Sequence, residues 1–134
     1  MSQKIPPRPT DGELAILRVL WRLGSSTVRQ IHNAFNRERE TETGYTTTLK
    51  LLQIMTEKGL VERDETERPQ IYRARFSQEQ TQRQMVSDLV DRVFGGSARQ
   101  LVMQALVTKE ASDEELAQVE QLLDKLEEGR NEQD

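Results

Sequence analysis

The polar side chains between Thr46 and Glu57 are the strongest candidates for a functional site, and their types are those that bind nucleic acid. Thr46, Thr47, Lys50, Gln53 and Glu57 share one face of a 3.6-residue period. Hydroxyl, amide and ammonium groups form hydrogen bonds with base edges and phosphates in the major groove of DNA. The spacing therefore predicts a helix that reads DNA with Thr46, Thr47, Lys50 and Gln53.

A second set of candidate contacts consists of the arginines that follow this helix. Arg63, Arg68, Arg73 and Arg75 lie in two runs where apolar and charged residues roughly alternate, as in half-exposed strands. Outward-facing arginines there, Arg63, Arg68 and Arg73 above all, could reach a phosphate backbone. Four acidic residues are interleaved with them, so ordinary solvated surface charge is an equally open interpretation.

Catalysis and metal binding find little support in the sequence. His32 is the only histidine and there is no cysteine, so triads, thiolate zinc sites and disulfides have no basis. The acidic groups at Glu38, Glu40 and Glu42 and at residues 113–115 lie in a charged loop and at a predicted helix start, where acids favour the helix dipole. No glycine-rich phosphate loop is present. The sequence predicts a non-enzyme without metal or cofactor.

The elements that must position the candidate contacts begin with a helix from Tyr45 to Lys58. Its apolar face is predicted from residues 48, 51, 52 and 55, and Gly59 ends it. Leu60 and Val61 open one strand, and Ile71, Tyr72 and Phe76 mark a second. The polar segment 64–69 forms the turn, with Pro69 where the second strand begins.

Two further helices precede this unit. Thr10 and Glu13 form a capping box for a helix from Asp11 to Leu23. Thr27 and Gln30 open a second helix, and the segment from residue 36 to 43 is predicted to be a charged loop. The predicted core residues are Leu14, Leu17, Leu20, Trp21, Val28, Ile31 and Phe35. Three helices and a hairpin predict a winged helix-turn-helix over residues 1–76.

The pattern of the second half of the chain predicts three helices, over about 78–94, about 98–106 and about 113–128. Gly95 and Gly96 separate the first two. Each helix is apolar along one side, and three such stripes cannot be buried fully against one another. The sequence thus predicts a helical homodimerisation domain over 77–134, with plain packing within one subunit as the alternative. The predicted dimer residues are Leu89, Val93, Leu101, Leu106, Leu116, Val119, Leu123 and Leu126.

Charge and hydropathy limit the mode of DNA binding and the cellular location that we expect. Residues 1–76 carry 13 basic and 10 acidic side chains, whereas residues 77–134 carry 6 and 13, for a net charge of −4. An acidic protein, with a pI of 5.2, does not suit nonspecific coating of DNA. No stretch reaches the roughly 18 apolar residues of a membrane span, so no membrane insertion and a cytoplasmic location are expected.

Four segments of the chain form a recognisable series: Tyr45–Lys50, Met55–Val61, Tyr72–Ala74 and Val93–Ser97. In their order and spacing they resemble the penicillinase-repressor family of bacterial transcriptional regulators (BlaI/MecI type). The likeness runs from about Asp11 to Glu128. The resemblance implies a homodimer that represses transcription from a palindromic operator of double-stranded DNA.

The resemblance also implies a mode of release. In that family a membrane sensor that responds to β-lactams leads to cleavage of an Asn-Phe bond in the helix after the double glycine. The matching positions here are Gln104 and Ala105. The sequence therefore predicts release by proteolysis in the C-terminal domain, through a regulatory protease or membrane sensor. The cleaved peptide bond and the inducing signal stay unassigned. A protein-interaction module and a small-molecule-sensing regulator remain alternative functions.

Overall fold

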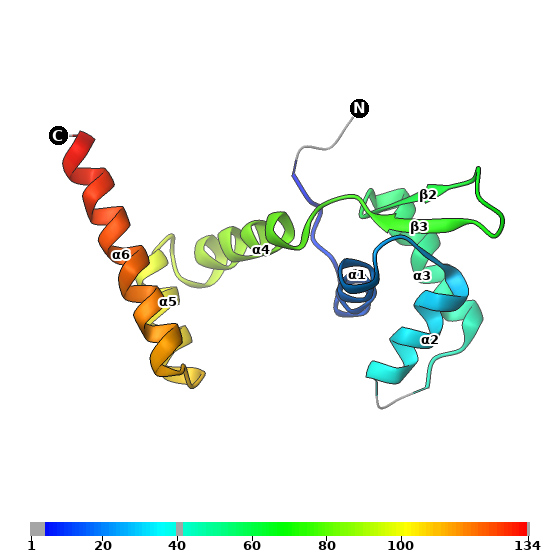
Figure 1. The fold of residues 1–134 in the computed structure, drawn as a ribbon, viewed down its shortest axis with the longest axis horizontal. Coiled ribbons are helices and arrows are strands. Elements are labelled where there is room, and N and C mark those ends of the chain that lie inside the picture. The colour runs from blue at the N-terminus through cyan, green and yellow to red at the C-terminus, as the bar shows by residue number, and fades with distance from the viewer. Residues whose placement is uncertain (1–4, 40–41, 134) are drawn as a thin grey trace. The chain divides into compact units, whose positions relative to one another are not determined.

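The computed structural model describes residues 5–39 and 42–133 and shows a mainly helical chain with one small antiparallel sheet (Figure 1). The chain forms two compact units, Met1–Asp88 and Leu89–Asp134. This architecture confirms the predicted fold class, a winged helix-turn-helix followed by further helices. The division at residue 76 into DNA-binding and dimerisation domains concerns function and stays a prediction. Glu40 lies outside the described residues.

Helix α1 (Asp11–Leu23) begins at the predicted capping box. The Glu13 amide donates to Thr10 Oγ1 at 3.3 Å, and the Thr10 amide donates to Glu13 Oε1 at 2.8 Å. Its fully buried apolar residues are Ile16, Leu17, Val19 and Leu20. Leu14 and Trp21, predicted for the core, are only partly buried. The helix contacts α2, α3 and the sheet. The buried part of its circumference is therefore wider than the single apolar face that was predicted, and it also includes residues 16 and 19.

Helix α2 (Val28–Glu38) also begins at its predicted capping box, formed by Thr27 and Gln30. It buries Ile31, Ala34 and Phe35. The prediction that a loop starts at Asn36 was wrong, because the helix continues to Glu38. The Asn36 side chain, which looked like part of a solvated loop, instead forms two hydrogen bonds with the backbone of Thr43.

Helix α3 (Tyr45–Lys58) has the bounds that the sequence predicts. Thr48, Leu52 and Met55 are buried on its inner face. Gly59 ends the helix in the left-handed conformation, with φ of 84°, and the Leu60 amide donates back to the Met55 carbonyl at 2.9 Å. This glycine cap turns the chain directly from α3 into the sheet.

The sheet has the strand order β1-β3-β2 and is antiparallel throughout. β2 (Val61–Asp64) and β3 (Ile71–Ala74) form the predicted hairpin, or wing. Leu60 and Phe76 lie just outside these strands but are buried. The third strand, β1 (Ser26–Thr27), was not predicted, since two residues are too short to show alternation.

One apolar core joins the helices to the sheet. Its members come from α1, α2, α3, β2, β3 and the turn before β2. They are Ile16, Leu17, Leu20, Ile31, Phe35, Leu52, Met55, Leu60, Val61 and Tyr72. A fully buried side chain of this size contributes about 1.5–3 kcal/mol relative to an exposed one, so this cluster is the main source of stability in the first unit.

Three helices follow the sheet: α4 (Gln78–Val93), α5 (Ala98–Thr108) and α6 (Asp113–Gln133). Gly95 and Gly96 end α4 with φ of 59° and 86°. α6 continues past Glu128, where it was predicted to end. The residues around Gly129 are mostly good helix formers, which offsets the roughly 1 kcal/mol cost of one glycine.

An ion pair between a buried carboxylate and a partly exposed lysine connects α1 to α3. Glu13 is only 2% exposed, and its Oε1 lies 2.6 Å from Lys58 Nζ. Lys58 also donates to the Arg8 carbonyl at 3.2 Å. Burial by itself would raise the pKa of Glu13, but the hydrogen bonds from Lys58 and Thr10 outweigh it and hold the pKa below its ordinary value. Glu13 is therefore charged at neutral pH and ties the end of α3 to the start of α1.

The variant Glu13→Gln should be less stable than the wild type at neutral pH, by about 1–3 kcal/mol. A carboxyl group with a lowered pKa contributes stability that is full above its unfolded pKa, near 4.5, and is lost as the pH falls through the folded pKa. The difference between the two proteins should thus shrink toward acid pH. Urea unfolding between about pH 7 and pH 3 measures it.

Glu57→Gln, the same change at an exposed position of α3, serves as the control and should alter stability little. A Glu13→Gln deficit that stays constant across this pH range would contradict the ion pair.

Candidate nucleic-acid interface

The outer face of α3 is polar and open to solvent. Thr46, Thr47, Lys50, Gln53 and Glu57 are all exposed, on the side opposite the buried positions 48, 52 and 55. Side chains on this face are free to enter a groove about 12 Å wide, such as the major groove of DNA. The structure thus brings the four predicted base-reading residues onto one accessible surface, and their contact with DNA remains a proposal.

The start of α3 is shaped by contacts with α2. Gly44 is the N-cap residue and supplies no side-chain hydrogen bond, but its carbonyl accepts from the Thr47 and Thr48 amides at 3.1 and 3.2 Å. The Tyr45 ring meets the His32 ring edge-on, with centroids 5.4 Å apart. The Arg29 guanidinium lies 4.5 Å from the Tyr45 ring centre. This cluster places a cation and an aromatic ring beside the first exposed threonines.

His32 holds α3 through its ring nitrogens. Nδ1 lies 2.9 Å from Thr48 Oγ1, and Nε2 lies 3.1 Å from Asn36 Nδ2. The sequence suggested only a packing or surface residue here. The missed signal was the spacing of His32 and Asn36, because residues four apart on a helix are neighbours.

The wing arginines are paired within the wing. Arg73 Nε lies 3.0 Å from Glu62 Oε2 across the two strands, and Arg63 Nη2 lies 2.5 Å from Glu65 Oε1. Arg68 Nη1 donates to the carbonyls of Glu65 and Glu67 at 2.6 and 3.2 Å. All three predicted phosphate contacts are exposed, but each already has a partner.

Charge in the wing stays balanced around neutral pH. A side-chain hydrogen bond with Tyr72 and the charge of Glu65 raise the pKa of Arg63. Hydrogen bonds from Thr66 lower the pKa of Asp64. Residues 61–75 carry four arginines and four acidic residues. The charges of Arg63 and Arg73 are therefore partly offset by neighbouring carboxylates, which weakens their attraction to a phosphate.

The predicted dimer residues lie on three helices that expose much apolar surface. Leu89, Leu106, Leu116 and Leu123 are exposed, as are Val93 (65%) and Leu126 (57%), while Leu101 and Val119 are intermediate. Exposed apolar side chains in such number on 46 residues of one unit are unusual for a monomer. They fit a surface that another chain covers.

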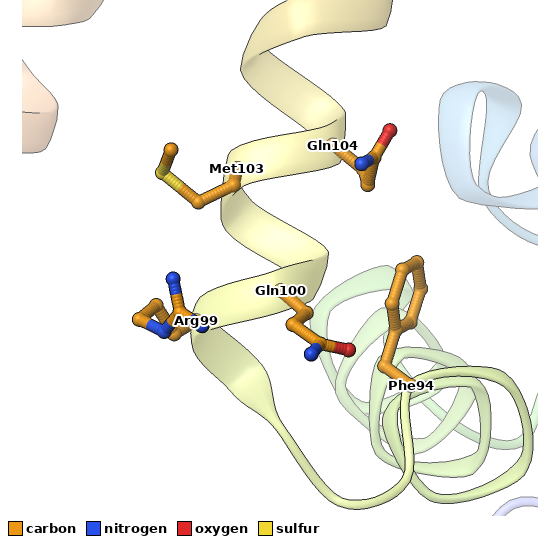
Figure 2. A pocket seen from close by; sticks show the side chains of 5 residues that line it. All are labelled: Phe94, Arg99, Gln100, Met103 and Gln104. Carbon is orange, nitrogen blue, oxygen red and sulfur yellow. The ribbon is translucent and has the colours of Figure 1, made fainter.

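Helix α5 carries Gln104 and Ala105, the bond at which the sequence resemblance implies cleavage. Figure 2 shows a hollow beside α5 lined by Phe94, Arg99, Gln100, Met103 and Gln104, with Gln100 and Gln104 on the side of the Phe94 ring. Gln104 and Ala105 are exposed, but both lie inside the helix. A protease that binds extended substrates would reach this bond only after local unfolding.

Over residues 5–39 and 42–133 no cluster of histidine or acidic side chains has the arrangement of a metal site. Across the same residues, no helix combines the length and apolar character needed to cross a membrane.

Comparison with known proteins decides the family. The family model of the penicillinase repressor matches residues 9–125. The chain belongs to the penicillinase repressor family. Its family is one of DNA-binding transcriptional regulators. No curated protein sequence matches the chain.

Two solved structures are similar to this family member. One is a MarR family protein from Bacillus stearothermophilus, with 26% identity and a TM-score of 0.48 over 93% of this chain and 77% of that one. The other is the transcriptional regulator PA4135, with 19% identity and a TM-score of 0.44 over 90% of this chain and 78% of that one.

The double variant Glu62→Gln, Glu65→Gln frees Arg73 and Arg63, and it should bind any DNA duplex more tightly than the wild type. With up to two added phosphate contacts, the slope of log affinity against log salt should steepen by as much as about 1.8. Fluorescence anisotropy with a labelled duplex over a salt series measures both quantities.

Glu120→Gln, Glu127→Gln makes the same change in net charge on the exposed surface of α6 and should alter the slope little. If both double variants behaved alike, the wing pairs would not limit DNA binding.

Proposed function

We propose that this chain is a homodimeric transcriptional repressor that binds a palindromic operator with two winged helices. One observation carries the proposal: α3 separates a buried face from an exposed face that carries hydroxyl, amide and ammonium groups. Thr46, Thr47, Lys50 and Gln53 read base edges in the major groove. Arg63, Arg68 and Arg73 of the wing contact the phosphate backbone once their internal pairs open.

The second copy supplies most of the affinity. A wing whose arginines pair with its own acidic residues, together with one short helix, makes few phosphate contacts. Each such contact contributes to salt-dependent affinity. Two copies on one side of the duplex double those contacts. Half-sites about one helical turn apart, or a multiple of it, are the geometric consequence. The operator's palindrome would reflect the two-fold symmetry of the protein.

The dimer forms through the apolar side chains of the last three helices. The residues that we assign to it are Leu89, Val93, Leu101, Leu106, Leu116, Val119, Leu123 and Leu126. Their exposure in one chain supports an isologous interface that buries them. The acidic charge of this part of the chain keeps it away from DNA phosphates.

Proteolysis in the C-terminal domain releases the repressor in the cytoplasm. A regulatory protease, activated by a membrane sensor, cuts within α5 and separates the dimer helices from one another. Gln104 and Ala105 are exposed in the single chain, and local unfolding of α5 would present their bond in the extended form that a protease binds. Loss of the second copy then removes the affinity that depends on it.

A small-molecule-sensing regulator is the second candidate, since a groove lies between α1 and the start of α4. Its volume is about 290 Å³, and its walls include Leu14, Trp21, Met85 and Val86. Ligand pockets usually enclose about 300–1,000 Å³, so this open groove is at the small end. Screening for a compound that releases a bound duplex, with Trp21 fluorescence as the binding signal, decides between the two functions.

Lys50→Glu should weaken sequence-selective binding by tenfold or more while leaving the dimer intact. Reversal of one charge on the reading face replaces an attraction to DNA with a repulsion, and a close pair of charges near a surface interacts by a few kcal/mol. The probe is a duplex that the wild-type protein enriches from a random-sequence pool.

Lys109→Glu makes the same charge change just after α5, where the residue is exposed, and should bind nearly as the wild type does. Equal affinities for wild type and Lys50→Glu would remove α3 from the interface.

Leu123→Asp should dissociate the dimer, because an unpaired carboxylate in an apolar interface costs several kcal/mol. Sedimentation equilibrium at micromolar concentration measures the assembly state. Gln121→Asp, on the same helix and exposed, adds the charge without removing an apolar contact and should remain dimeric. A dimeric Leu123→Asp would show that this face of α6 is not the interface.

A further inference from the structure

His32 occupies the junction between α2 and α3. Its Nδ1 lies 2.9 Å from the Thr48 hydroxyl oxygen, and Thr48 is fully buried. Its Nε2 lies 3.1 Å from Asn36 Nδ2 on the next turn of α2. The imidazole therefore lies between one partner on the reading helix and one on its own helix.

The orientation of Asn36 fixes which ring nitrogen carries the proton. Asn36 Oδ1 accepts from the Thr43 amide at 3.0 Å, and Asn36 Nδ2 donates to the Thr43 carbonyl at 2.9 Å. If the Asn36 amide were flipped, its NH₂ group would face the Thr43 amide and its oxygen would face the Thr43 carbonyl, so neither hydrogen bond could form. The Nδ2 group therefore faces His32, and its second hydrogen needs an acceptor. Nε2 must be that acceptor, which leaves the ring proton on Nδ1 as the donor to Thr48.

This arrangement controls the rotation of α3 about its own axis. Leu52 and Met55 hold α3 by apolar contacts, which have no preferred direction. The hydrogen bond to Thr48 is directional, and Thr48 follows Thr47 directly and precedes Lys50 by two residues. The edge-on contact of His32 with Tyr45 holds the preceding turn as well. A small rotation of α3 would redirect every side chain on its outer face.

We propose that His32, with its proton on Nδ1, is a positioning residue that sets the rotation of α3 and thereby the sequence selectivity of DNA binding. The inference rests on the proposed function, since α3 must read DNA for its rotation to matter. His32 is not among the residues that we assign to base contacts. Its loss should therefore reduce discrimination between sequences much more than general affinity for DNA, which depends on charge.

Two variants and a control separate this role from simple stability. His32→Leu removes both hydrogen bonds and leaves the Thr48 hydroxyl without its donor. His32→Asn keeps a side-chain donor near the place of Nδ1. Asn33→Ala changes an exposed neighbour on the same helix. The probes are the duplex that the wild type enriches from a random-sequence pool and a scrambled duplex of equal length and composition.

We expect His32→Leu to lower the ratio of selected to scrambled affinity about tenfold, the equivalent of one lost buried hydrogen bond. Affinity for the scrambled duplex should change by less than about threefold, and Asn33→Ala should match the wild type. His32→Asn should recover most of the selectivity. The readings are taken at a temperature where urea unfolding shows every variant to be folded.

Nitrogen-15 NMR of the protein without DNA gives a readout that stability alone does not move. It should show one protonated ring nitrogen, Nδ1, coupled to a slowly exchanging hydrogen, whereas free histidine prefers the proton on Nε2.

A proton on Nε2, or unchanged selectivity in His32→Leu, would overturn the positioning role and leave the proposed function intact. A wild-type protein that enriches no duplex would overturn the proposed function, and the positioning role with it.

Discussion

The orientation of α3 depends on polar contacts at its two ends. Near its start, Thr48 bonds to His32 of α2, and at its end Lys58 pairs with buried Glu13 of α1. Apolar contacts between these points supply most of the free energy of packing but little direction. The hydrogen bonds supply direction, because their strength falls steeply as the angle departs from linearity. Everything that the outer face of α3 can do follows from this arrangement.

The distribution of charge agrees with a regulator that reads sequence more than it binds phosphate. The wing pairs its own arginines with its own acidic residues, as in the contact between Arg73 and Glu62. These pairs reduce the positive charge that Arg63 and Arg73 offer to DNA phosphates. Apolar side chains such as Leu123 and Val93 are correspondingly exposed on the last three helices, which is the surface a second copy would need. The proposed weak binding of one copy and the proposed dimer are therefore consistent with each other.

Local signals made much of the fold predictable from the sequence. Thr10 with Glu13 and Gly59 specify helix ends through neighbours within a few residues, and α1 and α3 have the predicted bounds. The contacts that orient α3 were not predictable in this way. Glu13 and Lys58 are 45 residues apart and His32 and Thr48 are 16 apart, so no periodicity relates them. The pairing of Arg73 with Glu62 likewise depends on strand register, which composition does not reveal.

The most direct measurement of the central claim is photo-cross-linking from α3. A photoreactive amino acid replaces Thr47 in one protein and Gln121 of α6 in another, and each is irradiated with the duplex that the wild type selects. The account predicts a covalent bond from position 47 to bases inside each half-site and none from position 121. Cross-links from position 47 only to protein, or none to bases, would contradict the claim that this face of α3 lies in the major groove.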